Sequence, residues 1–150
     1  MKNAESSSAS RVNRRSLLCG FALVTLGLAA NVIPDSAQAA TGIKVLKSGK
    51  LQVTIAANKA LAKVGGAVIL QMQDGSELGI VRTAPGIKGF AALSLTCPHN
   101  GATVMEQGNQ WLCPAHGSLF SLSGALIQGP ARQALSKYPL AATAKYLIIG

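Results

Sequence analysis

Two short segments of this chain each contain one cysteine and one histidine, and they constrain the fold more than any other feature. The first reads Cys97-Pro98-His99 and the second, after a gap of 13 residues, reads Cys113-Pro114-Ala115-His116. They contain the only two histidines of the chain and two of its three cysteines. Thiolate and imidazole are both good ligands for transition metals. Gathering all four side chains within so short a stretch predicts a metal site on loops that must come together.

The rest of the sequence from Gly42 onward predicts an all-β domain, a small antiparallel sandwich or barrel. Apolar and polar residues alternate in Leu51-Gln52-Val53-Thr54-Ile55, which is the two-residue period of a strand. The spacing of such runs predicts eight or nine short strands, with 56–63 as a helical turn or a loop. Hairpin signals lie between apolar runs at Asp74-Gly75, Gln107-Gly108-Asn109 and Ser123-Gly124.

Both cysteine–histidine segments are expected to lie on loops, because the strands expected at 90–95 and 110–112 lead directly into them. The hairpin around Gly108 then brings the two loop tips together. Structural zinc sites usually use wider ligand pairs such as C-x-x-C. The two side chains of C-x-H tend to diverge, which favours two metal atoms over one. Zinc, or a disulfide between Cys97 and Cys113 with idle histidines, remains an alternative at this point.

The pattern C-x-H followed by C-x-x-H resembles the signature of Rieske iron–sulfur proteins. The resemblance extends from about residue 90 to 140 and is weaker over the rest of the domain. Glycines follow both loops, and Gly129-Pro130-Ala131 resembles the proline loop that shields the cluster in that family. The supporting residues are Gly101, Gly117, Ser118 and Gly124. The resemblance implies a β domain of the Rieske type with a cluster-binding subdomain at about 90–131.

The same resemblance implies one two-iron, two-sulfide (2Fe-2S) cluster per chain. Cys97 and Cys113 would hold the buried iron, and His99 and His116 would hold the outer iron. Ser118 would donate a hydrogen bond to a bridging sulfide. Neutral histidine ligands leave the cluster less negative, which places Rieske reduction potentials at roughly −150 to +300 mV.

The chain departs from the quinol-oxidising cytochrome bc branch of the family at three positions. That branch has an extra cysteine in each loop, joined in a disulfide, and a tyrosine whose hydroxyl bonds a ligand sulfur. Here these places hold Ala102, Ala115 and Phe120. Hydrogen bonds to the sulfurs raise the potential of such centres. We therefore expect a potential in the middle or lower part of the Rieske range.

The N-terminal segment has the pattern of an export signal. A basic start containing Arg14-Arg15 precedes an apolar run from Leu17 to Ile33, which is followed by Ala37-Gln38-Ala39. This predicts a twin-arginine-type signal or an uncleaved anchor over 1–40, and the Rieske domain over 41–150. We expect cleavage near Ala39 or Ala40, which would give a periplasmic protein; the alternative is retention, which would give one anchored in the inner membrane and facing the periplasm. Cys19 lies in the apolar run, where it acts as an apolar filler.

The charge is strongly positive, with 14 Lys and Arg against 5 Asp and Glu and a formal net charge of +9. Ten of the positive side chains and three of the negative ones lie beyond residue 40. This favours an acidic protein partner or an anionic surface, although the lysines can equally form a plain solvated face. Binding of nucleic acid is not expected, because the positive charges are scattered and no aromatic platform lies among them.

These features predict one-electron transfer in the periplasm, to or from another redox protein such as an acidic c-type cytochrome. No catalytic site is expected in the chain itself, since both histidines are used as ligands. One alternative is the Rieske small subunit of a larger oxidoreductase, of the quinol–cytochrome c reductase type or a molybdenum oxidase such as arsenite oxidase. The alternative of another class is a zinc-binding or disulfide-stabilised binding protein without redox activity. A ring-hydroxylating oxygenase needs a second iron domain, for which the chain has no room.

Overall fold

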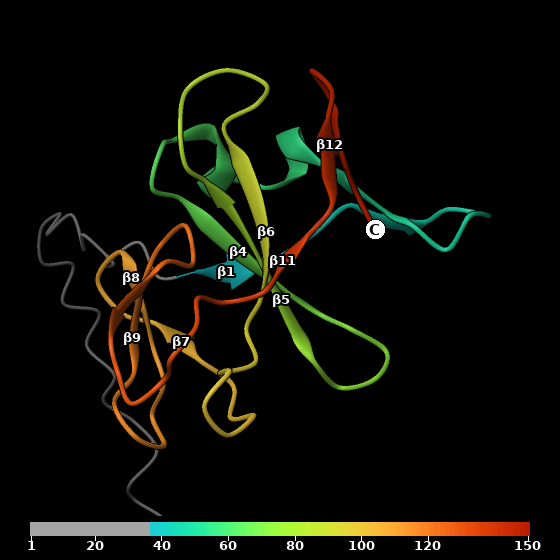
Figure 1. The fold of residues 1–150 in the computed structure, drawn as a ribbon. Coiled ribbons are helices and arrows are strands. Elements are labelled where there is room, and N and C mark those ends of the chain that lie inside the picture. Colours follow the sequence, from blue (N-terminus) through green and yellow to red (C-terminus); the bar gives the residue numbers. More distant parts are fainter. Residues whose placement is uncertain (1–36) are drawn as a thin grey trace, which may run out of the picture. The chain divides into compact units, whose positions relative to one another are not determined.

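A computed structural model describes residues 37–150 of the chain, and these residues form an almost entirely β structure. They contain 13 strands in three sheets and two short 3-10 helices (Figure 1). The predicted all-β fold is therefore confirmed. The strand number exceeds the predicted eight or nine, because several strands of two or three residues are too short to show a periodic pattern. Arg14-Arg15, Cys19 and the apolar run lie outside the described residues.

The central sheet has five strands in the order β1-β4-β5-β6-β11. Strands β4, β5, β6 and β11 are antiparallel neighbours, whereas β1 pairs with β4 in parallel. Strand β11 lies beside β6, although about forty residues separate them in sequence. The bounds are Gln38–Ala39 for β1, Ala67–Gln71 for β4, Glu77–Arg82 for β5, Phe90–Ser94 for β6 and Lys137–Tyr138 for β11.

A second sheet packs against one part of the central sheet and has the order β12-β13-β3-β2. Alternate residues of its strands, such as Val53, Leu147 and Ile149, are buried in a shared core with Leu78 and Ile80 of β5. The segment 56–63, expected as a helical turn or a loop, lies in the helices η1 and η2, which bring Leu61 into this core. The bounds are Ile43–Val45 for β2, Leu51–Thr54 for β3, Ile55–Ala57 for η1, Lys59–Ala62 for η2, Leu140–Ala142 for β12 and Tyr146–Ile149 for β13.

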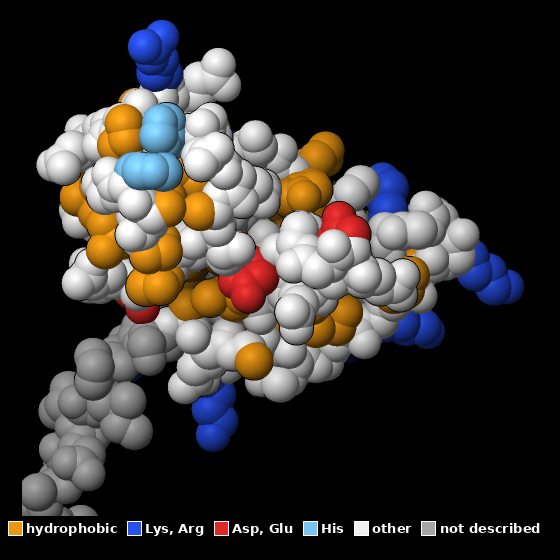
Figure 2. Space-filling model, turned by 90° about the horizontal axis from the view of Figure 1, so that it is seen from below, with side chains coloured by type: hydrophobic (Ala, Val, Ile, Leu, Met, Phe, Trp, Pro, Cys, Tyr) orange, Lys and Arg blue, Asp and Glu red, His pale blue; other side chains and the backbone are white. Residues whose placement is uncertain are grey.

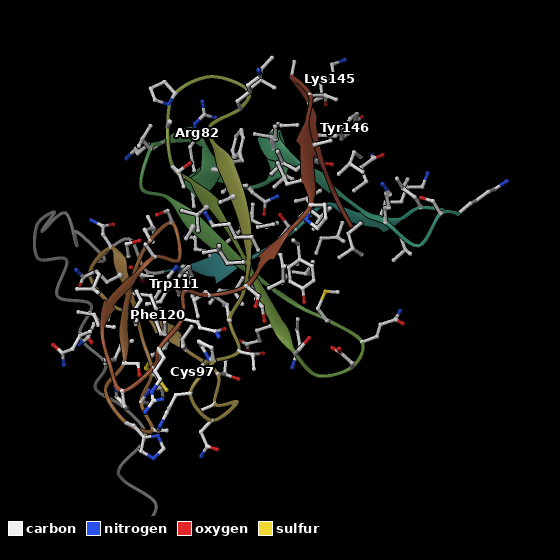
Figure 3. All side chains as sticks on the ribbon, in the orientation of Figure 1. Arg82, Cys97, Trp111, Phe120, Lys145 and Tyr146 are labelled. Atoms are coloured by element: carbon white, nitrogen blue, oxygen red, sulfur yellow. The ribbon has the colours of Figure 1, made fainter. Side chains whose placement is uncertain are left out.

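The third sheet, in the order β10-β9-β8-β7, carries the cysteine–histidine segments. Its core is built around Trp111 and Phe120, both fully buried, and the Trp111 indole N–H donates to the Leu122 carbonyl at 3.0 Å (Figure 3). The Trp111 ring lies over Gly79, where an added Cβ would be 3.3 Å from the ring. The bounds are Met105–Glu106 for β7, Gln110–Leu112 for β8, Leu119–Ser121 for β9 and Leu126–Gln128 for β10.

The segment just before the predicted domain start is part of the fold. Ala40 donates its N–H to the Ile69 carbonyl at 2.7 Å, which continues the pairing of β1 with β4. The buried Asn58 side chain accepts the Thr41 N–H at 2.8 Å and donates to the Thr41 carbonyl at 2.9 Å. The Ala37 N–H donates to the Glu106 carboxylate at 3.2 Å. This anchoring of 37–41 was not predicted from the sequence.

None of the helices within residues 37–150 is both long enough and apolar enough to cross a bilayer.

Candidate metal centre

Two loops with the same backbone pattern hold the cysteine–histidine segments. We call them the first loop, Cys97–Ala102, and the second loop, Cys113–Ser118. In each, the cysteine N–H donates to the carbonyl five residues later at 2.8 Å, and its own carbonyl accepts an N–H from the glycine four residues later at 2.9 Å. These glycines, Gly101 and Gly117, have φ values of +76° and +75°, a conformation that glycine adopts without strain. Each loop is therefore a closed turn that begins at its cysteine.

The predicted hairpin joins the two loops. Gln107 and Gln110 exchange N–H to carbonyl hydrogen bonds at 2.8 and 3.2 Å across Gly108 and Asn109, whose φ values are +57° and +64°. Two consecutive positive φ values are typical of the tight turn that matches the twist of paired strands. Because β7 and β8 pair directly, the first loop, which precedes β7, lies next to the second loop, which follows β8. The expectation that this hairpin brings the loop tips together is confirmed.

Burial divides the four candidate ligands into an inner and an outer pair. Cys97 and Cys113 are free thiols with 1% of their surface exposed, and they belong to the same core as Trp111. His99 and His116 are exposed, with ring centroids 4.8 Å apart in an edge-to-face arrangement at 88°. Figure 2 shows the two histidines side by side on the surface. The loops thus present sulfur on the inside and imidazole nitrogen on the outside.

The surroundings of Cys97 shift the pKa of its thiol, and the causes act in both directions. Burial raises the pKa of the Cys97 thiol, and the neighbouring Cys113 thiol raises it further. The backbone N–H groups of His99 and Asn100 oppose this rise, because they form hydrogen bonds that favour the thiolate. A metal ligand must be deprotonated. The first loop therefore supplies hydrogen bonds that favour a thiolate at Cys97.

Ser118 is the last residue of the second loop and is fully buried. Its Oγ accepts the N–H of Ala131 at 2.9 Å, so it joins the second loop to the segment 129–133, which we call the proline loop. Among the described residues no acceptor is found for the Ser118 hydroxyl hydrogen, which leaves this hydrogen available to a cofactor atom. Sequence reasoning identified Ser118 and the proline loop but missed the bond between them.

The donor set fits a 2Fe-2S cluster. Two thiols and two imidazoles offer one pair of ligands to each of two irons. Within residues 37–150, no three His, Cys, Asp or Glu side chains converge to hold a single metal ion. A cluster with two protein ligands per iron does not need such a group. The five residues singled out from the sequence, the four candidate ligands and Ser118, all lie in the two loops.

Comparisons with known proteins agree with this arrangement. The family model described as "Rieske [2Fe-2S] domain" matches residues 47–139. The chloroplastic cytochrome b6-f complex iron-sulfur subunit of Volvox carteri is 30% identical over 117 residues. This match covers 75% of the chain and 56% of the relative, so the chain spans little more than half the length of this curated protein.

Solved structures show the same fold. The plasma membrane Rieske protein PetC3 from Synechocystis PCC 6803 is 26% identical with a TM-score of 0.51, over 65% of this chain and 94% of that one. The quaternary ammonium Rieske monooxygenase CntA is 18% identical with a TM-score of 0.53, over 65% of this chain and 30% of that one. At that identity the second likeness concerns the fold alone. The chain belongs to the Rieske [2Fe-2S] family, whose domain binds a 2Fe-2S cluster and transfers electrons.

Proposed function

We propose that this chain is an exported one-electron carrier, with Cys97 and Cys113 as ligands of the inner iron and His99 and His116 as ligands of the outer iron. The observation that carries the proposal is the division of these four side chains into a buried sulfur pair and an exposed imidazole pair 4.8 Å apart. When bound, the cluster supplies a one-electron redox couple. The buried cysteines would hold the cluster on the side away from water, and the exposed imidazoles would lie where a partner could approach it.

A spectroscopic experiment tests this function. Protein purified under gentle conditions should be red-brown and contain two irons and two inorganic sulfides per chain. Its reduced form should give the electron paramagnetic resonance signal of a histidine-ligated cluster. A colourless, zinc-loaded protein would refute the proposal and favour the non-redox binding protein.

We further propose that the export segment is retained and anchors the protein in the inner membrane, facing the periplasm. Cleavage after Ala39 would remove β1 and cut the backbone beside the Ala40 to Ile69 hydrogen bond. Proteases cut flexible, exposed segments more readily than paired strands. A protein exported in the folded state would present this site as part of a sheet. The pairing of residues 37–41 therefore supports retention over cleavage near Ala39 or Ala40.

Mass spectrometry of the protein isolated from its host tests the retention. We expect a mature N-terminus well before Ala37 and a protein that stays in the membrane fraction after a carbonate wash. An N-terminus at Ala40 or Thr41 would contradict retention. Replacing Arg14 and Arg15 by Lys should block export if the twin-arginine route is used, which fractionation of the periplasm and membranes measures.

The second candidate function is that of a Rieske subunit in a larger oxidoreductase. The relative from Volvox carteri, a subunit of the cytochrome b6-f complex, favours this candidate. Purification in mild detergent followed by haem and molybdenum analysis separates the possibilities. Co-purifying haem b would indicate a complex of the quinol–cytochrome c reductase type. Co-purifying molybdenum would indicate an oxidase of the arsenite oxidase type. The absence of both would indicate an independent carrier.

A further inference from the structure

A surface pocket of about 480 Å³ opens beside one of the exposed imidazoles. It lies between the first loop and the proline loop, and its lining consists of Pro98, His99, Pro130, Arg132 and Gln133. Because His99 lines it, any group bound there lies next to a candidate iron ligand. Arg132 is the only charged residue of this lining.

Arg132 is held in place by its neighbours in sequence. The N–H of Ala131 is fixed by Ser118 at 2.9 Å, and the N–H of the buried Leu135 donates to the Gly124 carbonyl at 2.9 Å. The backbone on both sides of Arg132 is thus tied to the domain. Its own side chain is exposed, and within the described part of the chain no hydrogen bond or ion pair of its guanidinium is found. The guanidinium is therefore available to an incoming anion.

Arg132 is the one cation of the segment 90–136, which carries both histidines. Between residues 90 and 136 only Glu106 and Arg132 are charged, and the Glu106 carboxylate accepts the N–H groups of Ala37 and Asn109. Figure 3 places Lys145 at the opposite end of the domain from Cys97. Figure 2 shows apolar and uncharged side chains around the histidine pair, with most cations elsewhere. The surface around the histidines is therefore mostly uncharged, although the chain as a whole is strongly positive.

We propose that the pocket beside His99 receives an Asp or Glu side chain of the redox partner, and that Arg132 binds this carboxylate. The guanidinium fork matches a carboxylate with two parallel hydrogen bonds, which fixes orientation as well as charge. A partner surface with one carboxylate among uncharged groups would complement the surface around the histidines, where Arg132 is the charged group. This inference rests on the proposed electron transfer through the histidine end, and it narrows the partner to one with an acidic residue at the rim of its own redox site.

A carboxylate-bearing, redox-inert trianion, tris(oxalato)chromate(III), tests the inference by titration calorimetry on the cluster-loaded protein. Arg132→Gln should weaken its binding about tenfold, since a charge at a contact is lost. Lys145→Gln, which also removes one positive charge, should change the binding less than twofold. Arg132→Lys keeps the charge but loses the fork, so it should fall between wild type and Arg132→Gln.

Stopped-flow oxidation of the reduced protein gives a second measurement. Tris(oxalato)cobaltate(III) takes one electron and becomes Co(II), and Arg132→Gln should slow this reaction about tenfold and flatten its salt dependence. The cationic oxidant tris(phenanthroline)cobalt(III) should not be slowed. Equal losses in Arg132→Gln and Lys145→Gln, or unchanged binding in Arg132→Gln, would overturn the proposal. Such a negative result does not bear on the electron-transfer function, provided that the variants keep a normal cluster spectrum. A wild-type protein without a cluster would refute that function instead.

Discussion

Replacing Ser118 by Ala removes two roles that a single hydroxyl combines, and each loss has its own measurement. Its oxygen accepts the Ala131 N–H at 2.9 Å, and its hydrogen is available to the cofactor. The substitution leaves the Ala131 N–H without this acceptor in a place that water does not reach, because Ser118 is fully buried and Ala131 is only 4% exposed. The proline loop should then detach more often from the second loop, while the four candidate ligands stay in place.

The size of the effect follows from the burial. A buried donor left without its partner costs about 1–3 kcal/mol. At about 2 kcal/mol, local opening of the proline loop becomes roughly 30-fold more frequent. The lost hydroxyl donor should also lower the reduction potential. A difference of about 1 kcal/mol between the two redox states corresponds to roughly 45 mV for one electron.

Hydrogen exchange measured by mass spectrometry on peptides that contain 129–135 tests the loop, and a redox titration tests the potential. Ser121→Ala is a matched control, because the Ser121 Oγ also accepts an alanine N–H, from Ala125 at 3.0 Å, but in an exposed position. There water replaces the lost acceptor, so the cost should stay below about 1 kcal/mol. Unchanged exchange in Ser118→Ala, or an equal increase around Ser121 in its own variant, would refute the reasoning.

Three further substitutions probe the core, the ligands and an exposed turn. Gly79→Ala should destabilise the protein by about 1–3 kcal/mol in denaturant unfolding, because the added Cβ would lie 2.9 Å from the Leu95 side chain, and a smaller loss would mean that this core yields easily. His116→Ala should abolish the visible absorbance of the purified protein, and a merely shifted spectrum would argue against its role as a ligand. Ser76→Ala should raise the pKa of Asp74, because the Ser76 side-chain hydrogen bond is the largest cause that lowers it. The stabilisation that the Asp74–Ser76 hydrogen bonds give is therefore present at neutral pH and lost as the pH falls through the Asp74 pKa. An NMR titration of the Asp74 carboxyl measures this pKa in both proteins.

The fold class and the cofactor could be predicted because their signals are local. The ligand pattern lies within one short stretch, and the glycines after each cysteine mark the turns that Gly101 and Gly117 form with positive φ. The hairpin at Gly108 and Asn109 has an equally local sequence signal. The potential in the middle or lower Rieske range and the assignment of each ligand to an iron remain predictions.

Features that depend on distant contacts were missed. Strand β1 contains only Gln38 and Ala39, which lack the branched or aromatic side chains typical of strands, and its small residues match a cleavage site. Strand β1 forms only by pairing with β4, and the Thr41 N–H is bound by the side chain of the buried Asn58. The bond from Ala131 to Ser118, and with it the position of Arg132, arises from packing between segments that no periodicity connects.

The placement of β11 beside β6 has a consequence for how this protein can change. Leu93 pairs with Lys137, and Ser94 donates its N–H to the Ser136 carbonyl at 2.8 Å, so the chain leaves the central sheet and returns to it at adjacent points. Residues 95–135 therefore form one segment whose two ends lie side by side at the central sheet. Replacing this segment by that of another family member would leave the strands of the central sheet unbroken, but the new segment would have to fill the place of the Trp111 ring over Gly79. The cluster-binding segment and the central sheet can therefore diverge only where they do not share this core around Trp111.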